Sequence, residues 1–419
     1  MIPFEAGRTL PAKSLDFWFD YTCPYAYLGS TQARALAARM GVPLTYKPLL
    51  LGGVFRAHET PQRLFETLSP AKAAHNGEDL QRWARKFGVS LRMPAGHPIR
   101  SVEALRATLA CGPAKGAVLD PAATSPLDPK VIDAFYRAYW VDDADISDRA
   151  IVRKIVEAAG HDGGRVMEAI DTQAIKDDLK ARTDEAIGLG IFGVPSWVVD
   201  GVHLYWGQDR MHFVEGLRLE SAPAPRGEGK IVDAYFDFSS PFAYLGSTQI
   251  EKVARHVRWK PILLGGLFRS IGTPDAPVLT FSEAKRRYVM KDLDRWATFW
   301  GVPFSFPTRF PMVTVKALRT YLALPEERRG SFRERVFRAY WAEDQDISDD
   351  GVLARCIGDE GVARDAFAKS TTDAIKAELR KATEDAQQRG VFGVPTWIVG
   401  GEALYWGQDR LDLVADALG

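Results

Sequence analysis

The chain has 419 residues, which is long for one domain, since domains average about 150 residues. Hydrophobic residues make up 46% and charged residues 26%, a composition typical of folded globular proteins and not of disordered ones. Lysine plus arginine and aspartate plus glutamate both number 54. The resulting formal charge of zero argues against a general nucleic-acid-binding protein, which would carry a basic excess.

The sequence also bears on compartment. It contains no run of about 18 apolar residues, so we expect no membrane span. The opening residues, MIPFEAGRTLPAKSLDF, include no apolar stretch of signal-peptide length, so we do not expect export. Three cysteines cannot form a disulfide framework. We therefore expect a cytoplasmic protein in a reducing environment.

The chain is an internal duplication. Four pairs of segments correspond in the same order: DYTCPYAYLG (20–29) with DFSSPFAYLG (237–246), LLLGGVFR (49–56) with ILLGGLFR (262–269), AYWVDDADISD (138–148) with AYWAEDQDISD (339–349), and 191–211 with 391–411. The last pair agrees at 14 of 21 positions. Each copy has the size of a whole domain and not of a solenoid repeat. We place the domains at 1–220 and 230–419, joined by a short Pro- and Gly-rich linker at Glu220–Gly229.

The predicted elements of one copy follow in chain order. We expect a buried strand at Leu15–Phe19, a helix that starts near Pro24 and ends at Met40, a strand at Leu44–Leu50, a mostly helical segment from 61 to 190, two strands around an Asp200-Gly201 turn, and a helix near Asp209. The strand–helix–strand opening implies a parallel pair, and the closing hairpin adds antiparallel strands. The fold class is therefore α/β, with a large all-helical insertion in each copy.

The first candidate site is the turn between the first strand and the first helix, at Cys23-Pro24 and Ser240-Pro241. A thiol at a helix N-terminus lies beside free N–H groups and the positive end of the helix dipole, so we expect a lowered pKa and high reactivity for Cys23. Ser240 would instead donate a hydrogen bond to a bound anion or thiolate. The simpler alternative is that both residues only cap the helix.

The second candidate site is the repeated Gly-Val-Pro before the hairpin, at Val194-Pro195 and Val394-Pro395. A proline between a helix and a strand indicates a cis peptide bond that exposes backbone polar groups to a ligand, and we expect both bonds to be cis. The alternative is a plain helix stop. In the Y-W-G-Q-D-R segments that follow, the aspartates (Asp209 and Asp409) would either cap a helix or pair with a ligand ammonium group.

Other residues carry weaker signals. Arg56 and Arg269 follow the L-L-G-G segments and would either bind a substrate carboxylate or cover the surface. The acidic runs at 142–148 and 343–350 lack the spacing of a calcium loop, so we expect no metal site. We expect the recurring tryptophans at 83, 140, 296 and 341 to belong to the core. His97 corresponds to Phe310, so it is not chemistry shared by both copies.

Taken together, the motifs [CS]-P-[YF]-A-Y-L-G, L-L-G-G, F-G-V-P-[ST]-W and Y-W-G-Q-D-R resemble the DsbA-like thioredoxin superfamily. Within it, the sequence is most similar to 2-hydroxychromene-2-carboxylate isomerases and kappa-class glutathione transferases. The resemblance covers nearly all of both copies. It implies thioredoxin folds with a helical insert between the second and third core strands, and glutathione bound against the cis-proline.

The resemblance also implies site residues, copy by copy. The serine expected near the glutathione thiol falls on Ser240 in copy two and on Cys23 in copy one. The backbone of Val194 and Val394, beside Pro195 and Pro395, would bind the cysteinyl part of glutathione. The γ-glutamyl end would be held by Gln208, Asp209, Gln408 and Asp409. The family's Gly-Asn after L-L-G-G is replaced by Glu59-Thr60 and Gly272-Thr273, so Thr60 and Thr273 stand at the contact position.

The leading hypothesis is a glutathione-dependent isomerase or transferase of small aromatic substrates, with isomerisation favoured. In that reaction the glutathione thiol would add to a conjugated acid and leave again after a bond has rotated. One alternative is a thiol oxidoreductase that uses Cys23 as its single cysteine, because Ala26 stands where a dithiol enzyme would have its second cysteine. The other alternative is a fusion in which one copy is a scaffold. Single-copy relatives are expected to be homodimers, so we expect an internal pseudo-dimer that is monomeric as a chain.

Overall fold

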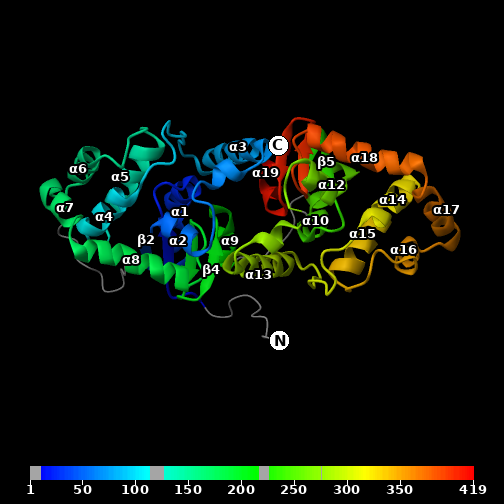
Figure 1. Cartoon of the computed structure of the whole chain (residues 1–419), viewed down its shortest axis with the longest axis horizontal. Coiled ribbons are helices and arrows are strands. Elements are labelled where there is room, and N and C mark those ends of the chain that lie inside the picture. Colours follow the sequence, from blue (N-terminus) through cyan, green and yellow to red (C-terminus); the bar gives the residue numbers. More distant parts are fainter. Residues whose placement is uncertain (1–10, 114–126, 217–225, 275) are drawn as a thin grey trace. The chain divides into compact units, whose positions relative to one another are not determined.

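The computed structural model describes residues 11–113, 127–216, 226–274 and 276–419. The chain forms two compact units, each built mainly from one repeat (Figure 1). The first comprises the described residues within Met1–Thr67, Gly77–Leu217 and Ser282–Lys285. The second comprises those within Leu68–Asn76, Arg218–Phe281 and Arg286–Gly419.

The first unit follows the predicted order of elements. Its strands are β1 (Leu15–Phe19), β2 (Leu44–Pro48), β3 (Ser196–Val199) and β4 (His203–Trp206). Its helices are α1 (Pro24–Met40), α2 (Leu51–Ala57), α3 (Pro70–Phe87), α4 (Val102–Cys111), α5 (Pro129–Trp140), α6 (Arg149–Ala158), α7 (Gly163–Ala169), α8 (Gln173–Gly188) and α9 (Met211–Glu215). The helices from α2 to α8 separate β2 from β3, which confirms the predicted helical insertion.

The second unit repeats this order. Its strands are β5 (Arg226–Phe236), β6 (Ala254–Pro261), β7 (Thr396–Val399) and β8 (Ala403–Trp406). Its helices are α10 (Pro241–Ser247), α11 (Ile250–Val253), α12 (Leu264–Ser270), α13 (Glu283–Trp300), α14 (Val315–Ala323), α15 (Glu326–Trp341), α16 (Asp350–Ile357), α17 (Glu360–Ser370), α18 (Asp373–Gln388) and α19 (Leu411–Leu418). The long helix of copy one is therefore replaced by the shorter α10 and α11.

Each unit contains one four-stranded mixed sheet, in the order β2-β1-β3-β4 and β6-β5-β7-β8. In the first sheet, β1 pairs in parallel with β2 and antiparallel with β3, and β3 pairs antiparallel with β4. The hairpin between β3 and β4 turns at Asp200 (φ 53°) and Gly201 (φ 72°), as predicted from the Asp-Gly pair. The second sheet has the same pairing.

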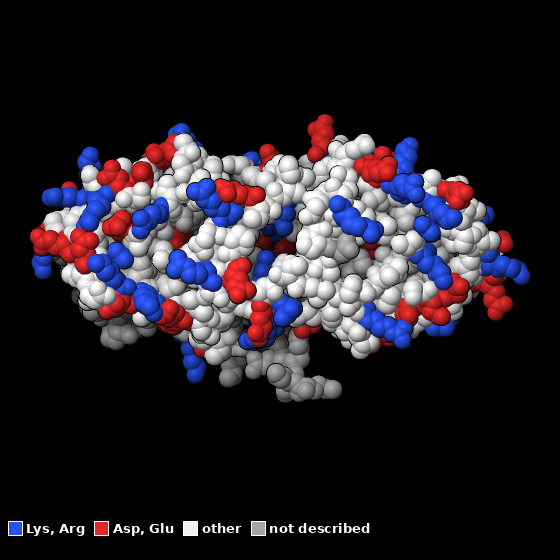
Figure 2. Space-filling view, viewed as in Figure 1, with Lys and Arg blue, Asp and Glu red and all other residues white. Residues whose placement is uncertain are grey.

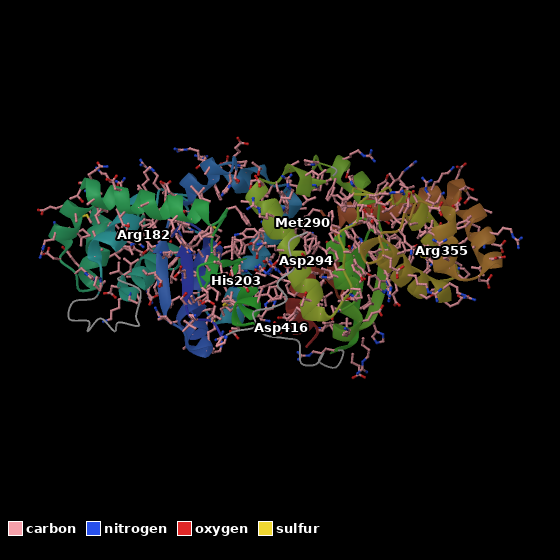
Figure 3. All side chains as sticks on the ribbon, turned by 90° about the horizontal axis from the view of Figure 1, so that it is seen from below. Arg182, His203, Met290, Asp294, Arg355 and Asp416 are labelled. Carbon is pink, nitrogen blue, oxygen red and sulfur yellow. The ribbon has the colours of Figure 1, made fainter. Side chains whose placement is uncertain are left out.

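The insertion of the first unit packs aromatic side chains against the sheet and α1, where Tyr136 of α5 contacts Phe19 and Tyr27. In Figure 1, α4 to α7 gather beside one end of the first sheet, and Figure 3 labels Arg182 on α8 and Arg355 on α16, both members of the insertions. Trp140 and Trp341 are fully buried, and Trp83 and Trp296 are 6% and 5% exposed, so the recurring tryptophans belong to the core as predicted.

The join between the repeats differs from the prediction. Residues 217–225 lie outside the described residues, so the end of the first domain at 220 and most of the expected linker stay predictions. Residues 226–229, however, are already part of β5, and Arg226 pairs with Ala254. The linker prediction is wrong for these residues: the two glycines there, Gly227 and Gly229, adopt φ of 83° and 84° within an irregular strand start.

Candidate functional site

In both units, the side chain at the strand-to-helix turn donates to the carbonyl before the repeated proline. Cys23 Sγ lies 3.1 Å from Val194 O, and Ser240 Oγ lies 3.1 Å from Val394 O. The two candidate sites of each unit, about 150 to 170 residues apart in sequence, are therefore one site.

The expectation of a lowered pKa for Cys23 is wrong. Burial raises the pKa of this thiol to about 12. The N–H groups of Ala26 and Tyr25 act to lower the pKa, but burial has the larger effect. The side chain keeps some exposure, but the surrounding protein removes the water that would stabilise a thiolate. Cys23 is therefore a protonated hydrogen-bond donor, as Ser240 is.

Ser240 has two roles. Its hydroxyl accepts from Ala243 N at 3.1 Å, so it caps α10. The same hydroxyl donates its single proton to Val394 O. The helix-capping alternative is thus correct for Ser240, but it does not account for the second hydrogen bond.

The predicted cis geometry is confirmed at both Val194–Pro195 and Val394–Pro395. Both valines are largely buried, at 5% and 6% exposure. Among the described residues, none accepts a hydrogen bond from the backbone N–H of either valine. Each site therefore holds a backbone donor whose hydrogen-bonding capacity is unused, next to a carbonyl oxygen that has a second lone pair.

Small residues allow the site elements to approach each other. A Cβ at Gly193 would lie 2.8 Å from the indole nitrogen of Trp206, and a Cβ at Gly393 would lie 2.7 Å from that of Trp406. The tryptophan of Y-W-G-Q-D-R therefore leaves no room for a side chain at the glycine of F-G-V-P.

The Q-D-R segments form short 3₁₀ turns after β4 and β8. Gln208 and Gln408 are only 2% and 3% exposed, so both residues are buried, and their contacts with a ligand stay predictions. The carboxylates of Asp209 and Asp409 lie 3.1 Å from the guanidinium of the following arginine in each unit. A ligand ammonium would share these carboxylates with an internal cation.

The residues after L-L-G-G end the short helices α2 and α12. The N–H groups of Thr60 and Thr273 bond to Phe55 O and Phe268 O, both at 2.8 Å, so these N–H groups are not available to a ligand. Arg56 and Arg269 are exposed, and no ion pair forms with either within the described parts of the chain. Their proposed contact with a substrate carboxylate stays a prediction.

Each unit also contains a buried carboxylate that was not predicted from the sequence, Asp20 and Asp237, both 1% exposed. Asp237 accepts from Ser239 N (2.9 Å) in the turn, from Leu264 N (2.8 Å) at the start of α12, and from Thr314 Oγ1 (2.7 Å) before α14. Burial raises the pKa of both carboxyl groups, and these hydrogen bonds oppose it. The aspartate therefore ties the turn to the insertion.

Asp20 makes the matching contacts. It accepts from Thr22 N at 3.0 Å and Leu51 N at 2.9 Å, and the hydroxyl of Ser101 also donates to it. The available signal was the aspartate that opens both D-Y-T-C-P and D-F-S-S-P, three residues before the site residue.

The weaker candidates do not join the site. Cys356 is buried and Cys111 partly exposed, and burial raises their pKa values to about 11 and about 12. In the acidic runs, Asp148 and Asp349 cap α6 and α16. Within the described residues, no group of three or more His, Cys, Asp or Glu side chains is placed to hold a metal ion.

Two surface properties complete the description. On the face shown in Figure 2, basic and acidic residues are interspersed. None of the helices in the described ranges is both long and apolar enough to cross a membrane.

This fold and this site define a thioredoxin-like protein, and the chain belongs to the family of DSBA-like thioredoxin domains, whose model matches residues 14–217 and again 231–419. Among its relatives, 2-hydroxychromene-2-carboxylate isomerase of Sphingobium xenophagum is 32% identical over 45% of this chain and 98% of its own length. Glutathione S-transferase kappa 1 of Rattus norvegicus is 27% identical over 47% of this chain and 92% of its own length. Each of these relatives matches about one repeat.

A solved structure of 2-hydroxychromene-2-carboxylate isomerase has 29% sequence identity to the chain. The superposition covers 45% of this chain and 94% of the isomerase chain, with a TM-score of 0.40. The two matches of the family model confirm the resemblance to the DsbA-like thioredoxin superfamily that the motifs predicted.

Proposed function

We propose that the chain is a glutathione-dependent enzyme of small aromatic substrates, and that it catalyses an isomerisation in preference to a transfer. The observation that carries this proposal is the hydrogen bond from Ser240 to the carbonyl before the cis-proline, beside the unused N–H of Val394. The relatives support it, since they are named 2-hydroxychromene-2-carboxylate isomerases and glutathione transferases.

The residues present fit glutathione. The unused N–H and the carbonyl of Val394 form the donor and acceptor pair that an extended peptide backbone requires, and Val194 offers the same pair in the first unit. Asp409 and Gln408 would hold the γ-glutamyl end, and Thr273 would contribute its hydroxyl. In the first unit Asp209, Gln208 and Thr60 take these places. Glutathione supplies a thiol that, once ionised, is a nucleophile for an electrophilic carbon.

Ser240 is the residue that tunes this thiol. The hydroxyl has one proton, and it now donates that proton to Val394 O. A bound thiolate next to Ser240 would compete for the proton, while Val394 O could take a ligand N–H instead. A charge-assisted hydrogen bond of this kind stabilises the thiolate and lowers its pKa. Arg269, exposed at the end of α12, would bind the carboxylate of an acidic substrate.

The one-cysteine oxidoreductase gains no support from the site. A thiol with a pKa of about 12 is almost fully protonated at neutral pH, and only the thiolate attacks a disulfide. Cys23 instead takes the place and the hydrogen bond of Ser240. The roles of both residues, the cytoplasmic location and the pseudo-dimeric arrangement stay predictions.

The test is the ionisation of bound glutathione. Its thiolate absorbs in the ultraviolet, so a pH titration of the saturated complex gives the pKa of the bound thiol. The saturated chain would hold two bound thiols, and Ser240 contacts only that of the second unit. For this thiol we expect a pKa at least one unit below that of free glutathione in wild type, and a rise of about one unit in Ser240→Ala, which loses one charge-assisted hydrogen bond of about 1.5 kcal/mol.

Ser240→Cys, which copies the first unit, is the matched control for loss of the hydroxyl and should give an intermediate value. A complex whose thiol titrates as free glutathione in all three proteins would refute the proposal, as would the absence of glutathione binding.

A further inference from the structure

Each unit has a segment, here called the strap, that runs beside the site turn: residues 90–101 in the first unit and 303–314 in the second. In the second unit, Tyr244 of α10 donates to Pro303 O at 2.6 Å, and Thr314 donates to Asp237 at 2.7 Å. Tyr244 lies four residues after Ser240 and Asp237 three before it. Both ends of the strap are therefore fixed to the element that carries Ser240.

The strap of the first unit is fixed in the same way. Tyr27 donates to Ser90 O at 2.7 Å, and Ser101 donates to Asp20. Two more hydrogen bonds match between the units. Arg92 N to Trp140 O (2.8 Å) corresponds to Ser305 N to Trp341 O (2.7 Å), and Ala95 N to Asp143 Oδ1 (3.1 Å) corresponds to Thr308 N to Asp344 Oδ1 (2.9 Å). The two straps thus have the same path and can be compared residue by residue.

The side chains on this common path differ sharply. The second strap places Phe304, Phe306 and Phe310 around the buried Trp341, with ring centroids 6.1, 5.8 and 6.3 Å from it. All three phenylalanines are only half-buried. Trp341 in turn donates from its indole N–H to Phe238 O at 2.8 Å, two residues before Ser240. A partly exposed aromatic layer therefore lies next to the Ser240 turn.

The first strap lacks this layer. Leu91, Met93 and His97 occupy the matching positions. Met93 is 44% exposed. The His97 ring lies 5.3 Å from Trp140, and its Nδ1 is 2.8 Å from the Tyr139 hydroxyl. The underlying tryptophan is the same in both units, since Trp140 also donates to the turn, at Tyr21 O. The two units thus differ in the strap side chains that cover this tryptophan, and not in the tryptophan itself.

From this comparison we propose that Phe304, Phe306 and Phe310 determine substrate specificity, and that the site of the second unit binds a planar aromatic group while the site of the first unit does not. This inference rests on the proposed function, because it assumes that a ligand joined to glutathione reaches the strap. Aromatic rings gain from burial against aromatic side chains beyond their area alone, whereas a histidine that is hydrogen-bonded to a tyrosine presents a polar edge.

Two probes separate the inference from the proposed function. S-methylglutathione and S-benzylglutathione share the peptide and the thioether, so they differ only in the phenyl ring. Calorimetric titration of the full chain should show two equivalent sites for S-methylglutathione. For S-benzylglutathione, one site per chain should bind at least tenfold more tightly than the other, which corresponds to about 1.4 kcal/mol.

Variants assign the tight site. Phe304→Leu with Phe306→Met and Phe310→His, which copies the first strap at these positions, should abolish the tight site. Leu91→Phe with Met93→Phe and His97→Phe should create a second one. Thermal unfolding followed by circular dichroism checks that both variants fold, and the second variant decides the question if the first does not. If S-methylglutathione binds but the variants leave the number of tight S-benzylglutathione sites unchanged, the inference is wrong and the proposed function stands. If S-methylglutathione does not bind at all, both fail.

Discussion

The protonation state of Cys23 decides between the two enzyme classes, and it can be measured in a variant that keeps Cys23 as its only cysteine, Cys111→Ser with Cys356→Ala. With a pKa of about 12, the thiolate fraction at pH 7 is ~10⁻⁵, against ~3% for a free thiol with a pKa of about 8.5. Alkylation by iodoacetamide should therefore be on the order of 10³-fold slower in the folded protein than in the unfolded chain.

The pH dependence separates ionisation from simple shielding. Because the pKa is raised, the rate should rise about tenfold for each pH unit from 6 to 10 without reaching a plateau. Steric shielding alone would lower the rate at every pH and leave the plateau where a free thiol has it. The assay is mass-spectrometric quantification of the alkylated peptide over time, with the same protein in guanidinium chloride as the reference.

A folded-state plateau at or below pH 8, or a rate at pH 7 within tenfold of that of the unfolded chain, would refute this reasoning. Either result would restore the interpretation of Cys23 as a helix-activated nucleophile and favour the oxidoreductase. Such an outcome would mean that the N–H groups of Tyr25 and Ala26 stabilise the thiolate more than burial destabilises it.

Two further predictions concern stability. Gly246→Ala should lower the free energy of unfolding by about 1–2 kcal/mol in guanidinium titrations, because the new Cβ would lie 2.8 Å from buried Trp397. Gly29→Ala, whose nearest contacts are at 3.3 Å, should change it by under about 1 kcal/mol, and equal losses would contradict the packing argument. Asp233→Asn should cost about 1 kcal/mol at pH 7, allowing for solvent around its two arginine partners. Burial acts to raise the pKa of Asp233, but Arg258 and Arg389 outweigh it, so the pKa is lowered. The cost should therefore vanish as the pH falls through the lowered folded-state pKa, and a cost that persists at pH 2 would contradict this.

Local patterns predicted the framework of each unit well because local chemistry determines it. Pro24 fixed the helix start, Asp200-Gly201 fixed the hairpin, and the proline after Val194 marked the cis bond. Each of these signals depends on the backbone preferences of one or two residues, and the duplication provided every signal twice. The insertion between the second and third strands followed from the order of the elements.

Properties set by tertiary packing were predicted less well. The helix N-terminus does place N–H groups at Cys23, but burial outweighs them, and no local pattern reveals how deeply a turn is covered. The burial of Gln208 was likewise not indicated by its motif, and its contact with a ligand stays a prediction. The role of Asp237 was missed because its partners at Leu264 and Thr314 are remote in sequence.

The duplication gives the two sites different capacities on a common backbone. Cys23 and Ser240 make the same hydrogen bond to the same carbonyl at the same distance, but a thiol is a weaker donor than a hydroxyl. Under the proposed function the second unit would therefore stabilise a bound thiolate better, and it is also the unit whose strap carries three phenylalanines. These two features lie in segments more than 60 residues apart, yet they favour the same unit. A homodimer cannot separate its sites in this way, because every substitution appears in both copies. Under the proposed function, the fused chain would keep the first site for ligand binding while the second acquires both the stronger donor and the aromatic wall.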